Sequence, residues 1–268
     1  MNNIGIFDSG VGGLGIFQEV KKLLPRENIT YLADTANCPY GDKSTQTIKE
    51  MCQRNTQFLI DMGAKIVVVA CNTASVSALN YLRSEFPSIP IVGVVPVVKT
   101  AAKITKNKRI GILATKRTLE SDYLKGLVNE FCPRENKYQI YCYASGDLVN
   151  LVENIDRYNE GEITKKVQNS VKPLVRNGVD VIALGCTHFP FLKDEIKKIA
   201  GEKVVVLDSN GAVARQVQRV LTKNKQLSEQ TGESEYKFYT TFDKVAFKLS
   251  IKNLIEIESD KAYLLKWK

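Results

Sequence analysis

A regular alternation between short apolar runs and longer helix-like stretches is the feature that most constrains how this chain can fold. The apolar runs have the length of strands and are rich in β-branched residues; they occupy residues 4–7, 29–33, 65–70, 91–95, 109–114, 138–144, 179–185 and 203–208. Helical patterns lie between them, at residues 14–24, 45–62, 74–86, 119–131, 162–177 and 190–200. Nearly continuous apolar strands that alternate with helices predict an α/β fold, with parallel sheets covered on both faces.

Two short motifs occur twice in the chain. DSG at residues 8–10 is echoed by DSN at 208–210, and ACNT at 70–73 is echoed by GCTH at 185–188. These echoes indicate two similar α/β domains, each a mostly parallel sheet flanked by helices. We expect the first domain to be discontinuous; the domains would comprise residues 1–96 with 208–268, and residues 97–207.

The C-terminal part of the chain has a weaker pattern. Residues 217–240 form a polar interval, and residues 241–268 have helical character after a short strand-like run, KFYT. We therefore expect the chain to return to the first domain through a polar segment and to end in a helix.

Composition excludes several classes of protein. Of 268 residues, 44% are hydrophobic and 25% are charged, which is ordinary for a soluble globular protein. Apolar runs such as residues 66–70 are too short to cross a bilayer, and MNNIGIFDSG lacks the basic start and long apolar core of a secretory signal. We expect a cytoplasmic protein that does not attach to a membrane.

Charge and cysteine content indicate which partners and metal sites the chain can have. The net charge is +9, but Lys and Arg alternate with acids and form no Arg-rich or aromatic-interleaved stripe, so we expect a lysine-rich surface and no nucleic-acid partner. The chain has six cysteines, no CxxC pair and a single histidine, so no zinc-type ligand spacing occurs. We expect reduced thiols and no metal.

The glycine-rich N-terminus imitates a dinucleotide-binding fingerprint. Gly10, Gly12 and Gly15 fit G-x-G-x-x-G after a strand, and Asp34 ends the next strand. However, Asp8 and Ser9 precede the first glycine, and a carboxylate there would oppose a pyrophosphate. A dinucleotide-dependent oxidoreductase therefore stays an alternative; otherwise these glycines allow a tight turn and a helix N-terminus that binds an anion such as a carboxylate.

Two cysteines stand where buried strands are expected to end and helices to begin. Cys71 follows KIVVVA and Cys186 follows VDVIALG, and helix N-termini favour the thiolate. Either cysteine alone would be read as a small buried hydrophobe. Two such thiols on one pocket suit racemisation, because one removes a proton from carbon while the other returns a proton to the opposite face. A thiol hydrolase needs one cysteine, and His188 lies unusually close to Cys186 along the chain for a triad partner.

At these residues the chain closely resembles the glutamate racemases of the cofactor-independent aspartate/glutamate racemase superfamily. The matching motifs run almost from end to end: residues 4–17, 31–44, 67–79, 110–121, 181–192 and 205–210. The resemblance implies two α/β domains with the active site in the cleft between them, and no cofactor. It also implies L- and D-glutamate as substrates, a homodimer, and a product used in peptidoglycan synthesis.

The resemblance assigns roles to particular residues. Cys71 would exchange the proton of D-glutamate and Cys186 that of L-glutamate. Asp8 and His188 match the assisting groups beside each thiol, and Glu153 aligns with a family acid near the second cysteine. The residues that match substrate-contacting pairs are Asp8 and Ser9, Tyr40 and Gly41, Asn72 and Thr73, and Thr187 and His188.

This set suits the chemistry, because a weakly acidic α-proton requires that the substrate's charges be held by fixed hydrogen bonds. Asp8 would receive the ammonium group, while the Ser9, Thr73 and Thr187 hydroxyls with nearby N–H groups would bind carboxylates. Plainer readings exist for the supporting residues, since Asn72 and Thr73 are also good helix-capping residues and Tyr40 also suits a core.

Three departures from the family pattern concern loops. VVPVVK at 94–99 replaces a Glu-Pro-Gly-like stretch, YASGDLVN lacks a customary proline, and DSN replaces DSG. The alternatives that stay open are a racemase of aspartate or another amino acid with the same two thiols, and a non-catalytic role such as the DNA gyrase binding of some family members, which no residue pattern here supports.

Overall fold

Two all-parallel sheets form the framework of the chain in the computed structural model, which describes residues 3–258 and 261–267. The chain divides into two compact units. The first unit contains the segments up to Val94 and from Asn210 onward, and the second runs from Val95 to Ser209. Part of the helix expected over 241–268 falls on residues 259, 260 and 268, which lie outside the described residues.

The first unit contains a six-stranded sheet in the order β10-β9-β2-β1-β3-β4, with every neighbouring pair parallel. Its strands are β1 (Asn3–Asp8), β2 (Asn28–Ala33), β3 (Ala64–Val69), β4 (Ile91–Gly93), β9 (Tyr236–Thr240) and β10 (Ala262–Leu264). Two 3-10 turns, η1 (Thr35–Asn37) and η2 (Tyr40–Asp42), follow β2. Strand β1 lies between β2 and β3 and is parallel to both. The turns that follow these three strands therefore lie at the same edge of the sheet.

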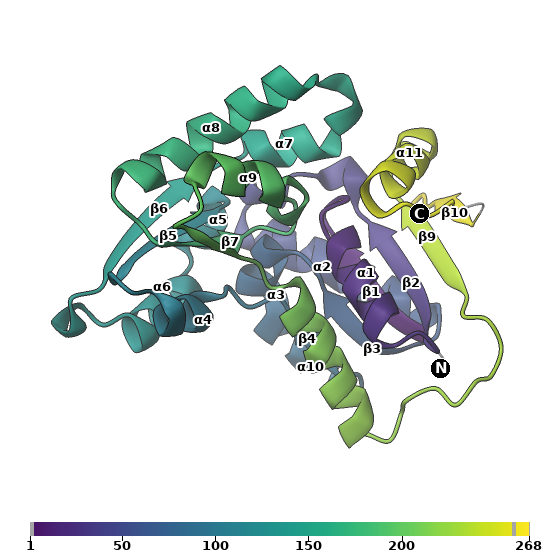
Figure 1. The fold of residues 1–268 in the computed structure, drawn as a ribbon. Coiled ribbons are helices and arrows are strands. Elements are labelled where there is room, and N and C mark those ends of the chain that lie inside the picture. Colours follow the sequence, from purple (N-terminus) through teal and green to yellow (C-terminus); the bar gives the residue numbers. More distant parts are fainter. Residues whose placement is uncertain (1–2, 259–260, 268) are drawn as a thin grey trace. The chain divides into compact units, whose positions relative to one another are not determined.

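Helices cover both faces of this sheet (Figure 1). Helix α1 (Leu14–Leu23) packs against α10 (Asn210–Lys223) and α11 (Lys244–Ile255), whereas α2 (Thr45–Asp61) packs against α3 (Asn72–Glu85). The chain moves in opposite directions across the sheet through α1 and α2, and right-handed crossovers therefore place them on opposite faces.

The second unit contains a four-stranded parallel sheet in the order β6-β5-β7-β8. Its strands are β5 (Arg109–Ala114), β6 (Gln139–Ala144), β7 (Val181–Gly185) and β8 (Val205–Leu207). Helix α8 (Glu160–Arg176) packs against α7 (Asp147–Glu153) and α9 (Lys193–Ala200), while α6 (Asp122–Phe131) packs against α4 (Val98–Ile104) and α5 (Lys116–Glu120) (Figure 1). Three 3-10 turns complete the unit: η3 (Arg134–Asn136), η4 (Ile155–Arg157) and η5 (Phe189–Leu192).

The two sheets share one strand order. Strands β2-β1-β3-β4 of the first unit correspond to β6-β5-β7-β8 of the second. In this correspondence β3 matches β7, so Cys71 and Cys186 follow equivalent strands. The DSG and DSN motifs do not occupy equivalent positions, because Asp8 ends β1 whereas Asp208 follows β8, the counterpart of β4.

The predicted α/β class with parallel, helix-flanked sheets is confirmed, and several local expectations are wrong. The sequence pattern predicts no helix at α4 or α7, because seven residues are too few to show a helical period of apolar residues. Helix α10 extends into the supposed polar interval because Val213, Val217 and Leu221 form its buried face. The helix expected over 241–268 forms as α11 and is followed by strand β10, since three residues become a strand only through pairing with β9. The helix expected over 119–131 is divided between α5 and α6 at Ser121.

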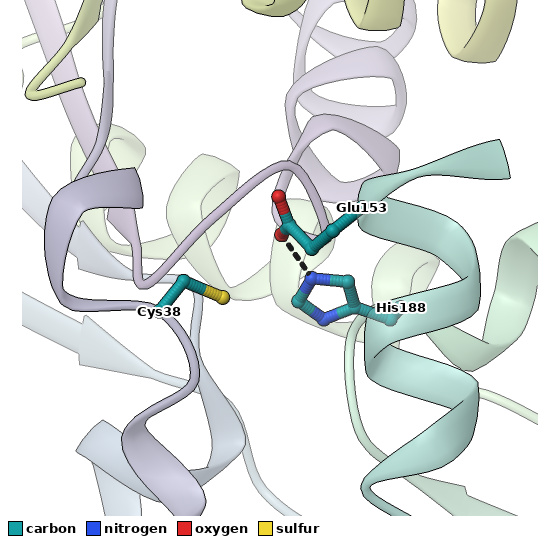
Figure 2. Close-up of side chains that lie close together, drawn as sticks. All are labelled: Cys38, Glu153 and His188. Atoms are coloured by element: carbon teal, nitrogen blue, oxygen red, sulfur yellow. Dashed lines mark hydrogen bonds and ion pairs between the residues drawn. The ribbon is translucent and has the colours of Figure 1, made fainter. Parts of the chain in front are cut away.

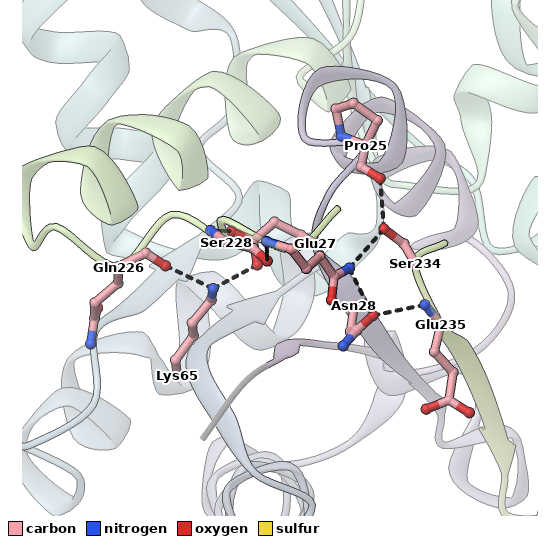
Figure 3. A network of polar contacts seen from close by, with 9 residues as sticks. Pro25, Glu27, Asn28, Lys65, Gln226, Ser228, Ser234 and Glu235 are labelled. Atoms are coloured by element: carbon pink, nitrogen blue, oxygen red, sulfur yellow. Dashed lines mark hydrogen bonds and ion pairs between the residues drawn. The ribbon is translucent and has the colours of Figure 1, made fainter. Parts of the chain in front are cut away.

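A buried ion pair closes the first unit at the amino ends of β2 and β3. Lys65 Nζ lies 2.6 Å from Glu27 Oε2 and donates to the Gln226 carbonyl, while Glu27 Oε1 accepts from the Ser228 N–H (Figure 3). These contacts fix the segment between α10 and β9 against the sheet, on the edge opposite to the turns that follow β1 and β3. Among the described residues, no helix is long and apolar enough to cross a membrane.

Candidate active site

In the first unit, the candidate residues gather where β1 and β3 end side by side. Asp8 is the last residue of β1, and Cys71 is the residue before the first turn of α3. The Ala70 N–H donates to the Phe7 carbonyl, which holds the two strand ends together. The carboxyl edge of a parallel sheet at such a change of direction is the usual place for a ligand.

Cys71 has a hydroxyl and a carboxylate close by. The Cys71 residue is 5% exposed, and its Sγ lies 3.6 Å from Ser9 Oγ, a hydrogen-bonding distance for sulfur. The Ser9 hydroxyl is in turn 3.2 Å from Asp8 Oδ1, to which it donates. The dipole of α3 favours negative charge at the start of this helix.

Asn72 and Thr73 occupy the first turn of α3 and are both 2% exposed. Asn72 Oδ1 and Nδ2 are buried, and within the described chain neither atom has a hydrogen-bond partner. An unpartnered buried amide is costly, so a side chain of this kind fits a ligand-binding role better than a capping role. No capping hydrogen bond from the side chain of Cys71 occurs at this helix start either.

The dinucleotide alternative finds no support at the glycine-rich turn. The Gly10 N–H donates to Asp8 Oδ1 at 2.8 Å, so the protein's own carboxylate occupies the position that a pyrophosphate would need. A side chain at Gly13 would collide with Asp8 Cβ at 2.8 Å and the Tyr31 hydroxyl at 2.9 Å. The glycine at position 13 therefore permits close packing of α1 on the sheet.

Tyr40 is fully buried, and its hydroxyl donates to Asp34 Oδ2 at 2.5 Å. Burial, and next the nearby Cys52 thiol and the Asp34 carboxylate, raise the pKa of Tyr40 well above its ordinary value, so the phenol stays neutral at physiological pH. Since this hydroxyl is engaged with Asp34, the backbone of Tyr40 and Gly41 is the part of η2 better suited to a ligand. The sequence predicted this segment but not the Asp34 contact.

In the second unit, Cys186 is the first member of a chain of three side chains. Cys186 Sγ lies 3.7 Å from His188 Nδ1, and His188 Nε2 lies 2.6 Å from Glu153 Oε1. Figure 2 shows the carboxylate of Glu153, from the end of α7, directed at the imidazole ring. Because an ionised carboxylate only accepts, Nε2 donates to Glu153, and in a neutral ring Nδ1 then presents a lone pair to the thiol.

This triplet is largely withdrawn from water. His188 is 2% exposed and the Glu153 side chain 14%. Thr187, between the cysteine and the histidine, is also buried. The carboxylate orients the ring and would stabilise an imidazolium if Nδ1 took a proton from sulfur.

The expectation that an α-helix begins directly after the thiol holds for Cys71 and is wrong for Cys186. The segment after it forms the 3-10 turn η5, and α9 begins at Lys193 rather than at residue 190. Pro190 lies in the first turn of η5, where it supplies no N–H. The thiol of Cys186 thus lies beside an imidazole, whereas that of Cys71 lies at the start of a long helix.

Three of the other cysteines are poor candidates for chemistry at neutral pH. Burial raises the pKa of Cys52 well above its usual value, raises that of Cys132 to about 11, and raises that of Cys142. Thiols with a raised pKa stay protonated near neutrality, and those of Cys52 and Cys132 are in addition buried.

Comparison with known proteins places the chain in a family. The profile described as Asp/Glu/Hydantoin racemase matches residues 15–217. The chain is 40% identical to the glutamate racemase of Herpetosiphon aurantiacus over 255 residues, which are 95% of this chain and 98% of that protein. This chain belongs to the Asp/Glu/hydantoin racemase family.

Solved structures of family members have the same fold. The glutamate racemase of Francisella tularensis in complex with D-glutamate superposes with a TM-score of 0.84 at 27% identity, covering 99% of this chain and 97% of that one. The Escherichia coli glutamate racemase in complex with L-glutamate and the activator UDP-MurNAc-Ala gives 0.85 at 29% identity, covering 98% and 97%. The racemase family predicted from the sequence motifs is thereby confirmed.

Proposed function

We propose that this racemase-family chain interconverts L- and D-glutamate without a cofactor, using Cys71 and Cys186 as the two proton-transfer groups. One observation carries the proposal: each cysteine follows the third strand of the same four-strand order, with a proton-handling side chain at 3.6 Å from Cys71 and 3.7 Å from Cys186. The relatives named above, including structures with each enantiomer of glutamate, support glutamate as the substrate.

The proposed reaction moves one proton off carbon and another onto it. Starting from D-glutamate, the Cys71 thiolate removes the α-proton, and the electron pair of the C–H bond remains on the α-carbon. The Cys186 thiol then gives its proton to the opposite face, which yields L-glutamate and leaves a thiolate at Cys186. The reverse reaction begins with that thiolate. The mechanism requires both thiols to reach the same α-carbon.

The two thiols would be assisted differently. In the second unit His188 Nδ1 accepts the Cys186 proton when a thiolate is needed, while Glu153 holds the opposite ring nitrogen. In the first unit Ser9 and Asp8 adjoin Cys71; the Ser9 hydroxyl, which donates to Asp8 in this structure, would turn to donate to the Cys71 thiolate when it forms. Glu153 acts through His188 and is therefore a positioning residue in this proposal.

The remaining predicted residues would hold the charges of the substrate. Asp8 would receive the ammonium group, and the Ser9, Thr73 and Thr187 hydroxyls would bind carboxylate oxygens. The buried Asn72 amide would donate from Nδ2 and accept at Oδ1, which satisfies two atoms that otherwise lack partners among the described residues. Fixed donors of this kind also stabilise the negative charge that spreads into the α-carboxylate when the proton leaves.

We further propose that the chain works in the cytoplasm as a homodimer, and that its D-glutamate supplies peptidoglycan synthesis. The family motifs carry this part of the proposal.

Circular dichroism of the purified full chain with L- or D-glutamate tests the function. We expect the signal of either enantiomer to decay to zero without added cofactor, and aspartate to react more slowly at equal concentration. No decay with glutamate, or faster decay with aspartate, would contradict the proposal. Tight binding of NAD(H) or NADP(H) would favour the oxidoreductase alternative instead.

A further inference from the structure

Asp34 is a fully buried carboxylate directly after β2 that no step of the proposed reaction uses. Removing a carboxylate from water is costly unless its oxygens are paired. Here they accept from the Tyr40 hydroxyl, from Asn37 Nδ2 at 2.9 and 3.1 Å, and from Thr241 Oγ1 at 3.0 Å. The Arg54 guanidinium lies 3.7 Å away.

These partners come from separate parts of the first unit. Asn37 and Tyr40 belong to the two turns after β2, Arg54 to α2, and Thr241 to the loop after β9. The Asp34 N–H also donates to the Asp8 carbonyl at 3.0 Å. Asp34 therefore links the strand end that carries Asp8, through its backbone N–H, to the turn that carries Tyr40, through its carboxylate.

The Tyr40 side chain is held from a second direction. Asn55 Nδ2, on α2, donates to its hydroxyl oxygen at 3.2 Å. The ring packs in the same buried cluster as Cys71 and Ala74, and η2 packs against α3. The position of the η2 backbone relative to Cys71 thus depends on where the Tyr40 hydroxyl is anchored.

We propose that Asp34 is a positioning residue for substrate binding: its buried carboxylate anchors the Tyr40 hydroxyl and so sets the Tyr40–Gly41 backbone beside Cys71. The inference rests on the proposed function, which gives this backbone its contact with glutamate. Asp34 itself does not touch the substrate. Loss of the anchor weakens the binding of both enantiomers and leaves proton transfer at the two thiols largely intact.

Glu27 offers a matched control, because it directly precedes β2 whereas Asp34 directly follows it. It is also a buried carboxylate with one ionic partner and one backbone N–H, but it lies at the amino end of β2 (Figure 3). Replacement of Glu27 by Gln removes a buried charge without touching Tyr40. A general loss of packing or charge balance would affect both variants alike.

The experiment measures KM and kcat for each enantiomer in wild type, Asp34→Asn, Tyr40→Phe, the double variant and Glu27→Gln. We expect KM to rise about tenfold in Asp34→Asn, the size of one lost charge-assisted hydrogen bond, with kcat changed less than about threefold. Tyr40→Phe should raise KM similarly, and the double variant should add little, because both changes remove one contact. Glu27→Gln should lower the melting temperature with KM unchanged.

Three results would overturn the inference: an unchanged KM in Asp34→Asn, additive effects in the double variant, or an equal rise of KM in Glu27→Gln. If Asp34→Asn does not fold, the KM of Tyr40→Phe still tests the inference, since this variant leaves the Asn37 and Thr241 contacts of Asp34 in place. The emission of Trp267, the chain's only tryptophan, whose ring lies 4.2 Å from the Arg54 guanidinium carbon, reports whether the first unit is intact. If wild type itself fails to racemise glutamate, the proposed function fails and not this inference alone.

Discussion

The two candidate thiols occupy equivalent places in the fold but have different neighbours. Cys71 follows β3, precedes the 14-residue helix α3, and has the Ser9 hydroxyl and the Asp8 carboxylate nearby. Cys186 follows β7, precedes a short 3-10 turn, and has the His188 imidazole backed by Glu153. One strand order thus gives the two cysteines different surroundings: a helix start with a hydroxyl in one unit, and an imidazole–carboxylate pair in the other.

This asymmetry cannot appear as different catalytic efficiencies for the two enantiomers. L- and D-glutamate have equal free energy in water, so kcat/KM must be the same in both directions for any variant. The asymmetry is expected instead in isotope effects and exchange, which report the individual proton transfers. The predictions below use those measurements.

Loss of either thiol should have the largest effect. Cys71→Ser and Cys186→Ser should each lower the rate of racemisation by about a thousandfold, because a serine hydroxyl is a much weaker acid than a thiol and each turnover needs both groups. Circular dichroism of the reaction measures this loss, and Cys132→Ser is the control, since burial raises the pKa of Cys132 to about 11 and it has no place in the proposal. Normal racemisation by either variant would end the two-cysteine account.

His188→Asn should lower kcat/KM about a hundredfold in both directions, the usual contribution of one acid–base group. Because only the step at Cys186 is slowed, that step should limit the rate. The primary isotope effect with α-deuterated L-glutamate should then rise, and that with α-deuterated D-glutamate should fall. Equal isotope effects for the two enantiomers would contradict the assignment of His188 to one thiol.

Glu153→Gln should lower kcat/KM about tenfold, because the amide still accepts from His188 Nε2 but no longer stabilises an imidazolium. In a His188→Asn background the same change should have no further effect, since Glu153 acts through the imidazole. Steady-state rates of the two single variants and the double variant test this. Additive losses would show that Glu153 has a separate role.

Ser9→Ala should have the smallest effect, a loss of about threefold to tenfold in kcat/KM, as expected for one neutral hydrogen bond. Its isotope effects should reverse the His188→Asn pattern and rise for D-glutamate. The control is Ser75→Ala, which removes a hydroxyl that bonds the Val69 carbonyl and the Val94 N–H. That variant should lose about 1 kcal/mol of stability with an unchanged isotope pattern.

Much of this account is readable from the sequence because the information is local. The apolar strands and the polar residues after them, such as Asp8 and Cys71, are contiguous in the chain, so the parallel α/β class and the candidate residues were predictable. Family motifs alone placed Glu153 near Cys186, and its contact with His188 was not predicted, since 35 positions separate the two residues along the chain.

What the sequence did not reveal depends on distant pairing. Strand β10 exists only by pairing with β9, and the role of Asp34 depends on Tyr40, Asn55 and Thr241, which lie on three different elements. The DSG and DSN motifs look alike in the chain but follow strands that are not equivalent in the sheets. Short motifs identify chemistry, whereas the strand order decides which of them correspond.

Solvent deuterium incorporation into single enantiomers by the two serine variants tests the central claim most directly. In deuterated water, Cys186→Ser should exchange the α-proton of D-glutamate but not that of L-glutamate, because Cys71 remains. Cys71→Ser should exchange L-glutamate only. Exchange of both enantiomers by either variant, or of the opposite enantiomer, would contradict a mechanism in which each cysteine serves one face of the substrate.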